Sequence, residues 1–187
     1  MRKMNYVLAC FVLCVINFAA IAHAADQPKT IAESLNRSVN GVEGEFVSAV
    51  EAMPEDKFSF VPTSGEFKGV RTFGQQVKHV AAVNYILGAG MLGEKPPVDT
   101  GGEDGPGSIQ TKADILKFLK DSYAYVHKGI ATITEKNAVE PVKSPFGEGM
   151  STRLGMASIT FGHSFDHYGQ LVVYLRMNGI IPPASRQ

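Results

Sequence analysis

Four long stretches of the chain carry apolar residues at the three- and four-residue spacing of an amphipathic α-helix. They have similar lengths, glycine and proline interrupt the sequence between them, and strand patterns are weak throughout. Helices of about 21 to 28 residues would each span about 30–40 Å. Four such helices, each with one apolar face to bury, predict a single all-α domain: an up-and-down four-helix bundle with two long loops.

The first two helices have clear ends. The apolar stripe of the first starts after Thr30 and reaches Met53, and Pro54 stops it. Thr72 and Gln75 form a capping-box pattern, which predicts the start of a second helix that continues to residue 91.

The boundaries of the last two helices are also marked by capping residues. Thr111 with Asp114 marks the start of a third helix, whose apolar face extends to residue 133. Ser151 is the predicted cap of a fourth helix that runs to Asn178, with Gly179 as its C-cap. The loops are then residues 93–110, which hold five glycines and three prolines, and residues 135–150. A loop as long as the first is often a lid or a binding segment.

A leader precedes this domain. After a short basic start, residues 4–21 are almost wholly apolar, and the small-x-small triplet Ala-His-Ala occupies residues 22–24. This order predicts a secretory signal peptide over residues 1–24 and a mature domain over residues 25–187, located in the periplasm or secreted, with no membrane span after cleavage. A retained transmembrane anchor is the alternative.

Removal of residues 1–24 changes the net charge and the cysteine content of the protein. The whole chain has 18 Lys+Arg, 18 Asp+Glu and a pI near 7.0. The leader carries two basic and no acidic residues, so the mature chain has 16 basic and 18 acidic side chains, a net charge of −2. This balance argues against a polybasic nucleic-acid binder. Both cysteines, Cys10 and Cys14, lie in the leader, so disulfides and thiolate ligands are excluded from the mature domain.

The histidines are the strongest candidates for chemistry. His163 and His167 are four residues apart on the fourth helix, which places both rings on one face. This face also carries Met156, Ile159, Leu171 and Tyr174. Imidazoles on an apolar face need hydrogen-bond partners or a metal to offset desolvation.

A third histidine can join this pair. His79 lies in the middle of the second helix, and facing helices of a bundle can bring it to His163 and His167. Three histidines without an obvious fourth protein ligand describe an open divalent-metal site, with zinc or nickel as the first choices and iron, manganese or copper as alternatives. The competing interpretation is a structural bundle with hydrogen-bonded core histidines. His127, near the end of the third helix, is interpreted as a boundary or surface residue.

A general base is harder to name. Asp166 lies beside the ligand pair but is better explained as a solvent-exposed carboxylate than as a base. The carboxylates in or beside the long loop could reach a metal only if the loop folds inward; they are Glu94, Asp99, Glu103 and Asp104. Three tyrosines are possible donors that are more often simply packed: Tyr123, Tyr125 and Tyr174. Gln76 and Gln170 are candidates to support the ligand imidazoles.

The last helix also carries a longer pattern. A His-x3-His pair is followed by Gly-Gln, an apolar run, Arg, and Asn-Gly before a proline pair; these residues are His163, His167, Gly169-Gln170, Arg176, Asn178-Gly179 and Pro182-Pro183. This helix resembles the closing helix of the DinB-like (damage-inducible, YfiT-like) family. The start of the second helix, with His79 downstream, resembles the same family, and the likeness extends over residues 30–183.

The resemblance implies a four-helix bundle with a three-histidine divalent-metal site at His79, His163 and His167. Some members are similar to thiol-dependent S-transferases or maleylpyruvate isomerases, and the export signal departs from that cytosolic chemistry. We therefore expect an exported metal-dependent hydrolase or transferase acting on a small molecule. A non-catalytic metal- or small-molecule-binding bundle is the alternative. We expect no nucleic-acid partner, and a homodimer is possible.

Overall fold

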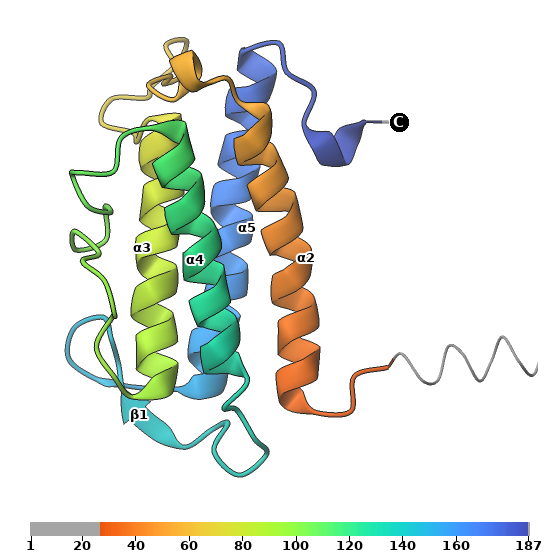
Figure 1. Ribbon diagram of the computed structural model, residues 1–187, viewed down its shortest axis with the longest axis vertical. Helices are drawn as coiled ribbons and strands as arrows, with labels where there is room; N and C mark the ends of the chain where they lie inside the picture. Colours follow the sequence, from red (N-terminus) through yellow and green to blue (C-terminus); the bar gives the residue numbers. More distant parts are fainter. Residues whose placement is uncertain (1–26, 187) are drawn as a thin grey trace, which may run out of the picture.

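The computed structural model describes residues 27–186, in which four long helices pack side by side (Figure 1). They are α2 (Ile31–Ala52), α3 (Phe73–Leu92), α4 (Lys112–Ile130) and α5 (Arg153–Met177). Two single-turn 3-10 helices are η1 (Glu55–Lys57) and η2 (Pro183–Ser185). The predicted all-α four-helix bundle with two long loops is confirmed.

Side-chain caps begin the helices largely as predicted. Thr30 and Thr72 each form a complete capping box, and the Thr111 hydroxyl accepts the backbone N–H of Asp114 at 3.1 Å. The prediction for α5 was wrong by one residue, because Thr152 rather than Ser151 is the N-cap. At the other end of α4, the helix stops at residue 130, three residues before the predicted apolar stripe ends.

Ser151 lies in a short antiparallel hairpin that the sequence did not predict. Strand β1 (Pro141–Lys143) pairs with β2 (Met150–Thr152), and Val142 is opposite Ser151. Strands of three residues are too short to display a clear apolar alternation. The hairpin leads directly into α5 and fixes the point where that helix begins.

The contacts at the helix ends give the direction of each helix. Lys112, at the start of α4, donates from Nζ to the carbonyl of Met53, which follows α2, at 2.7 Å. At the same end, the backbone N–H of Gly74, at the start of α3, donates to the carbonyl of Phe58 at 2.8 Å. Helices α3 and α4 therefore both begin where α2 ends, and they run in the same direction.

This arrangement departs from the predicted up-and-down order, in which α3 and α4 would be antiparallel. Arg153 Nε donates to the carbonyl of Met91 at 3.1 Å, so α5 starts where α3 ends and runs antiparallel to it. Helix α2 packs against α4 and α5, and α3 packs against the same two helices. The order of directions is up-down-down-up, because the loop over residues 93–110 returns along the length of the bundle before α4 begins (Figure 1).

Helix α3 lies deepest in the bundle, since most of its residues are buried. Its contact with α4 is close at Gly88, where a Cβ atom would lie only 2.7 Å from Cδ1 of Tyr125. Three polar residues of α3 are nevertheless almost completely buried: Gln76, His79 and Asn84. A buried polar side chain must find partners inside the protein, so these residues locate the region where a site can form.

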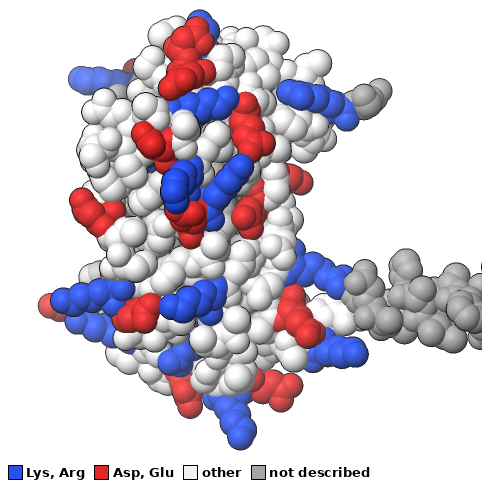
Figure 2. Space-filling model, in the orientation of Figure 1, with Lys and Arg blue, Asp and Glu red and all other residues white. Residues whose placement is uncertain are grey.

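Charged side chains of both signs are interspersed on the face of the molecule in Figure 2, without a large patch of one sign on that face. Among the described residues, no helix has the length and apolar character needed to cross a membrane. The predicted signal peptide, residues 1–24, lies outside the described residues.

Candidate metal centre

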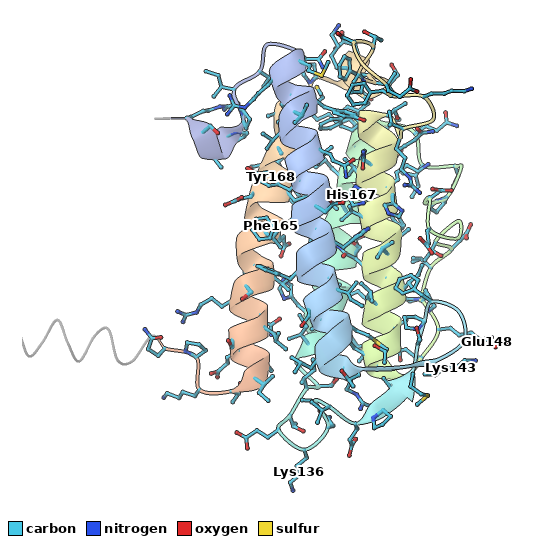
Figure 3. The ribbon with its side chains drawn as sticks, turned by 180° about the vertical axis from the view of Figure 1, so that it is seen from behind. Lys136, Lys143, Glu148, Phe165, His167 and Tyr168 are labelled. Atoms are coloured by element: carbon cyan, nitrogen blue, oxygen red, sulfur yellow. The ribbon has the colours of Figure 1, made fainter. Side chains whose placement is uncertain are left out.

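The structure brings His79 of α3 together with His163 and His167 of α5. One ring nitrogen from each histidine can be chosen so that the three atoms lie within 4.8 Å of one another. The Nε2 atoms of His79 and His163 are 3.0 Å apart. Figure 3 labels His167 on α5, on the side of that helix that faces α3. The three histidines that the sequence singled out therefore form one cluster.

The four-residue spacing on α5 places His163 and His167 on one face, as predicted, with ring centroids 4.5 Å apart. His167 is buried and His163 is half-buried. The prediction that Ile159 shares the buried face was wrong, because its side chain is 46% exposed. Ile159 lies one turn before His163 on α5.

Hydrogen bonds at Nδ1 fix the tautomers of two rings. His79 Nδ1 lies 2.6 Å from the backbone carbonyl oxygen of Glu103, and His167 Nδ1 contacts Oε1 of Gln76. A carbonyl oxygen only accepts, so each Nδ1 carries the proton and, in the neutral ring, Nε2 keeps its lone pair. Both rings are therefore prepared to bind a metal through Nε2, as ligand imidazoles commonly are.

The support for His167 continues through two more side chains. Gln76 Nε2 donates to Oε1 of Gln170 at 2.7 Å, and Gln170 Nε2 donates to Oδ2 of Asp166 at 3.1 Å. Gln76 and Gln170, which the sequence offered as supporting residues, thus connect a ligand imidazole to a carboxylate. This chain holds the ring of His167 and the orientation of both amides.

His163 is the one ring of the cluster with an unsatisfied atom. Its Nδ1 is buried and has no hydrogen-bond partner among the described residues. If Nε2 carries the proton and donates to His79, Nδ1 is a bare buried acceptor. If Nδ1 carries it, two Nε2 lone pairs face each other at 3.0 Å. Neither arrangement satisfies every polar atom. In the second arrangement, a cation between the two Nε2 atoms would remove the repulsion between their lone pairs.

Burial keeps the rings of His163 and His167 neutral. It lowers the pKa of His163 to about 3, with further lowering from the neighbouring His167 and His79. Burial also lowers the pKa of His167 to about 4, followed by the effects of His79 and of Arg71. Histidine binds a metal ion as the neutral imidazole, so these two rings are able to act as ligands at neutral pH.

The donor set fits a divalent ion. Metal–nitrogen bonds of about 2.1 Å that meet at about 90–110° separate their nitrogens by about 3.0–3.4 Å. The His79–His163 distance of 3.0 Å lies at the lower end of this range. All three ring nitrogens lie within 4.8 Å of one another, close to the about 4.2 Å that two such bonds can span in a straight line.

A pocket of about 660 Å³ opens beside this cluster. The residues of its wall that the chemistry can use are Arg71, Gln76, Lys78, Asp104, His167 and Gln170. One wall belongs to the loop over residues 93–110, which is anchored next to the cluster by the bond from His79 to the Glu103 carbonyl and by Lys78 Nζ to the carbonyl of Pro106 at 2.8 Å. The pocket reaches the cluster at His167, the one of the three histidines that lines it.

The other candidate residues lie in structural contacts. His127 is not part of the cluster: its ring bridges α4 to α2 through Asn36 at 2.6 Å and Glu43 at 2.9 Å. It is half-buried, which agrees with its interpretation as a boundary residue. The tyrosines bond to protein groups: Tyr123 to the Ser164 hydroxyl, Tyr125 to Glu94, and Tyr174 to the Arg71 carbonyl.

The loop carboxylates differ in position. Glu94 is engaged by Tyr125 at 2.6 Å, and Asp99 accepts the backbone N–H of Gly101 at 2.8 Å. Asp104 is the one that lines the pocket, paired with Arg71. Sequence reasoning missed Arg71 and the Glu103 carbonyl, because nothing local in the sequence marks a pair 33 residues apart or the use of a backbone oxygen.

The chain belongs to the DinB superfamily, whose family model matches residues 40–171. The resemblance predicted from the closing helix is confirmed. No curated protein matches this chain in sequence.

Solved structures share the fold. A DinB-like protein from Bacillus cereus has a TM-score of 0.66 at 16% identity, covering 84% of this chain and 98% of its own. YfiT from Bacillus subtilis, described as a probable metal-dependent hydrolase with an unusual four-helix bundle topology, has a TM-score of 0.59 at 17% identity, covering 83% and 94%. A mycothiol-dependent maleylpyruvate isomerase has a TM-score of 0.57 at 15% identity, covering 79% and 62%. At these identities the likeness establishes the fold.

Proposed function

We propose that the protein binds one divalent metal ion through the Nε2 atoms of His79, His163 and His167, and that it is an exported hydrolase or transferase acting on a small molecule. The observation that carries the proposal is the convergence of three imidazoles, two of which have their Nδ1–H groups tied to acceptors. The tautomers of His79 and His167 leave their Nε2 lone pairs available to a metal.

The surrounding pocket supports a catalytic use of the ion. Three protein ligands leave coordination positions for water or substrate, as in catalytic rather than structural metal sites. When bound, such an ion polarises a substrate carbonyl or lowers the pKa of a water molecule. Residues of this chain hold the imidazoles, since the Glu103 carbonyl and Gln76 fix their orientation, and the pocket beside His167 admits the substrate.

Zinc or nickel is our first choice of metal, with iron, manganese and copper as alternatives, because neutral imidazole suits all of these ions. The hydrolase class is favoured by the name given to YfiT, a probable metal-dependent hydrolase with the same fold. The predicted signal peptide is the basis for placing the protein in the periplasm or outside the cell, where a reaction that uses water needs no cytosolic thiol.

The proposal is tested by reconstitution. Metal-free mature protein is loaded separately with zinc, nickel, manganese or iron and assayed against a panel of small esters, amides and lactones. We expect hydrolysis with at least one metal, its loss in His163→Ala, and its retention in His127→Ala. Stoichiometric metal binding without turnover on any substrate class would favour the non-catalytic binding bundle, and absence of metal binding would favour a structural role for the histidines.

A further inference from the structure

An arginine that the proposed metal chemistry does not use forms part of the pocket wall. Arg71 donates from Nε at 3.2 Å and from Nη2 at 2.9 Å, and both bonds go to Oδ1 of Asp104. The backbone of Arg71 is held by α5, because its carbonyl accepts the hydroxyl of Tyr174 at 3.0 Å. The guanidinium is therefore presented to the pocket from a fixed point immediately before the N-cap of α3.

The pocket is arranged for negative charge. Asp104 is the single acidic residue of its lining, whereas Arg71 and Lys78 are both basic and the side-chain amides of Gln76 and Gln170 add polar groups. The pKa of the Asp104 carboxyl is held below its usual range, first by its hydrogen bond from Arg71 and then by the positive charges of Arg71 and Lys78. A carboxylate at this position is thus stabilised from several sides.

We infer that the pocket is a carboxylate-binding subsite, in which Arg71 releases Asp104 and binds the carboxylate of a small-molecule ligand, and this inference rests on the proposed metal-dependent function. Asp104 acts as the internal stand-in for the ligand group. Arg71 and His167 line the same pocket, so a ligand anchored at Arg71 lies in the space that borders His167. The arginine thereby selects anionic substrates and orients them.

The exchange is energetically easy. The side chains of Arg71 and Asp104 are 39% and 74% exposed, and an exposed ion pair contributes little net free energy. Asp104 returns to water when it is displaced. An arginine fork is suited to a planar carboxylate, which it can bind through two parallel hydrogen bonds, whereas the present pair uses only one oxygen of Asp104.

The test compares benzoate with benzamide, its neutral analogue of nearly the same shape. Their dissociation constants are measured by calorimetry and by ligand-observed NMR for zinc-loaded and metal-free mature protein. The variants are Arg71→Gln, Arg71→Lys and Asp104→Asn. Arg176→Gln is the matched control, because Arg176 carries the same charge but donates to the Ser185 hydroxyl, away from the pocket lining.

We expect benzoate to bind at least tenfold more tightly than benzamide. Arg71→Gln should remove this preference, Arg71→Lys should restore part of it, Asp104→Asn should tighten benzoate binding several-fold, and Arg176→Gln should change nothing. Equal binding of the two probes, or a benzoate preference that survives Arg71→Gln and disappears on metal removal, would overturn the subsite. Because metal content is measured in the same samples, a failure of the carboxylate subsite is distinguishable from a failure to bind metal.

Discussion

Replacing Gln76 with leucine should weaken metal binding without removing a ligand. Gln76 is buried, accepts from Nδ1 of His167 and donates to Gln170. Leucine is similar in size but apolar, so the His167 Nδ1–H loses its acceptor and the tautomer and orientation of the ring are no longer fixed. Loss of such a supporting partner typically reduces metal affinity by about 10–100-fold.

The magnitude follows from linkage between binding and folding. At a free-metal concentration about 100 times the wild-type Kd, metal adds about 2.7 kcal/mol to the free energy of unfolding. A variant that binds 10-fold more weakly gains about 1.4 kcal/mol at the same concentration, and one that binds 100-fold more weakly gains about 0.4 kcal/mol. For a chain of this size, each kcal/mol corresponds to about 2–4 °C in Tm.

The assay is a pair of thermal melts, with and without buffered zinc, for each protein. Gln110→Leu is the matched control, because the Gln110 side chain is exposed and donates to the carbonyl of Gly107 in its own loop. We expect the zinc-dependent increase in Tm to shrink by about half or more in Gln76→Leu and to be unchanged in the control. A variant that loses stability without metal yet keeps the full zinc-dependent increase would refute the role assigned to Gln76.

Three further predictions concern pH and packing. The pKa values of His163 and His167 are lowered to about 3 and about 4 in the folded protein, so the unfolded chain binds more protons below a pH of about 6.5. Metal-free protein should therefore lose stability as the pH falls from there toward 4. The plot of Tm against pH should be flatter in the double variant His163→Gln/His167→Gln, and an equally steep plot would contradict the assignment to these histidines. Gly88→Ala places a Cβ atom 2.7 Å from the Tyr125 ring. It should lower the free energy of unfolding by about 1–3 kcal/mol in denaturant melts, equally with and without metal. An unchanged free energy of unfolding would mean that α3 and α4 can separate freely. His127→Ala should leave metal content unchanged but lower the free energy of unfolding by about 1 kcal/mol, since it breaks the bonds to Asn36 and Glu43; metal loss in this variant would contradict the assignment of its role.

The helices were predictable because their signals are local. Thr72 with Gln75 and Thr111 with Asp114 mark helix starts within four residues, and the apolar stripes repeat within each helix. The direction of α4 was not predictable. The 18 residues of the loop over 93–110 can extend about 60 Å, which is more than the about 30 Å of a 20-residue helix, so the loop can either turn back at once or span the bundle.

For the candidate site, too, local features were predictable and long-range contacts were not. The spacing of His163 and His167 is visible in the sequence, and the buried middle of α3 provides His79 as their partner. The supporting contacts are long-range: Gln76 reaches Gln170 across 94 positions, and Arg71 reaches Asp104 across 33. The Glu103 carbonyl contributes through its backbone, and a backbone contact leaves no mark on residue identity.

The most direct test of the metal proposal is elemental analysis of the mature protein, purified without a polyhistidine tag and dialysed to remove loosely bound ions. The cluster of His79, His163 and His167 predicts about one divalent ion per chain in the wild type and in His127→Ala, and a loss of most of that metal in His163→Ala and His167→Ala. Wild-type protein that remains metal-free after exposure to zinc and nickel, or alanine variants that retain the full complement, would contradict the account.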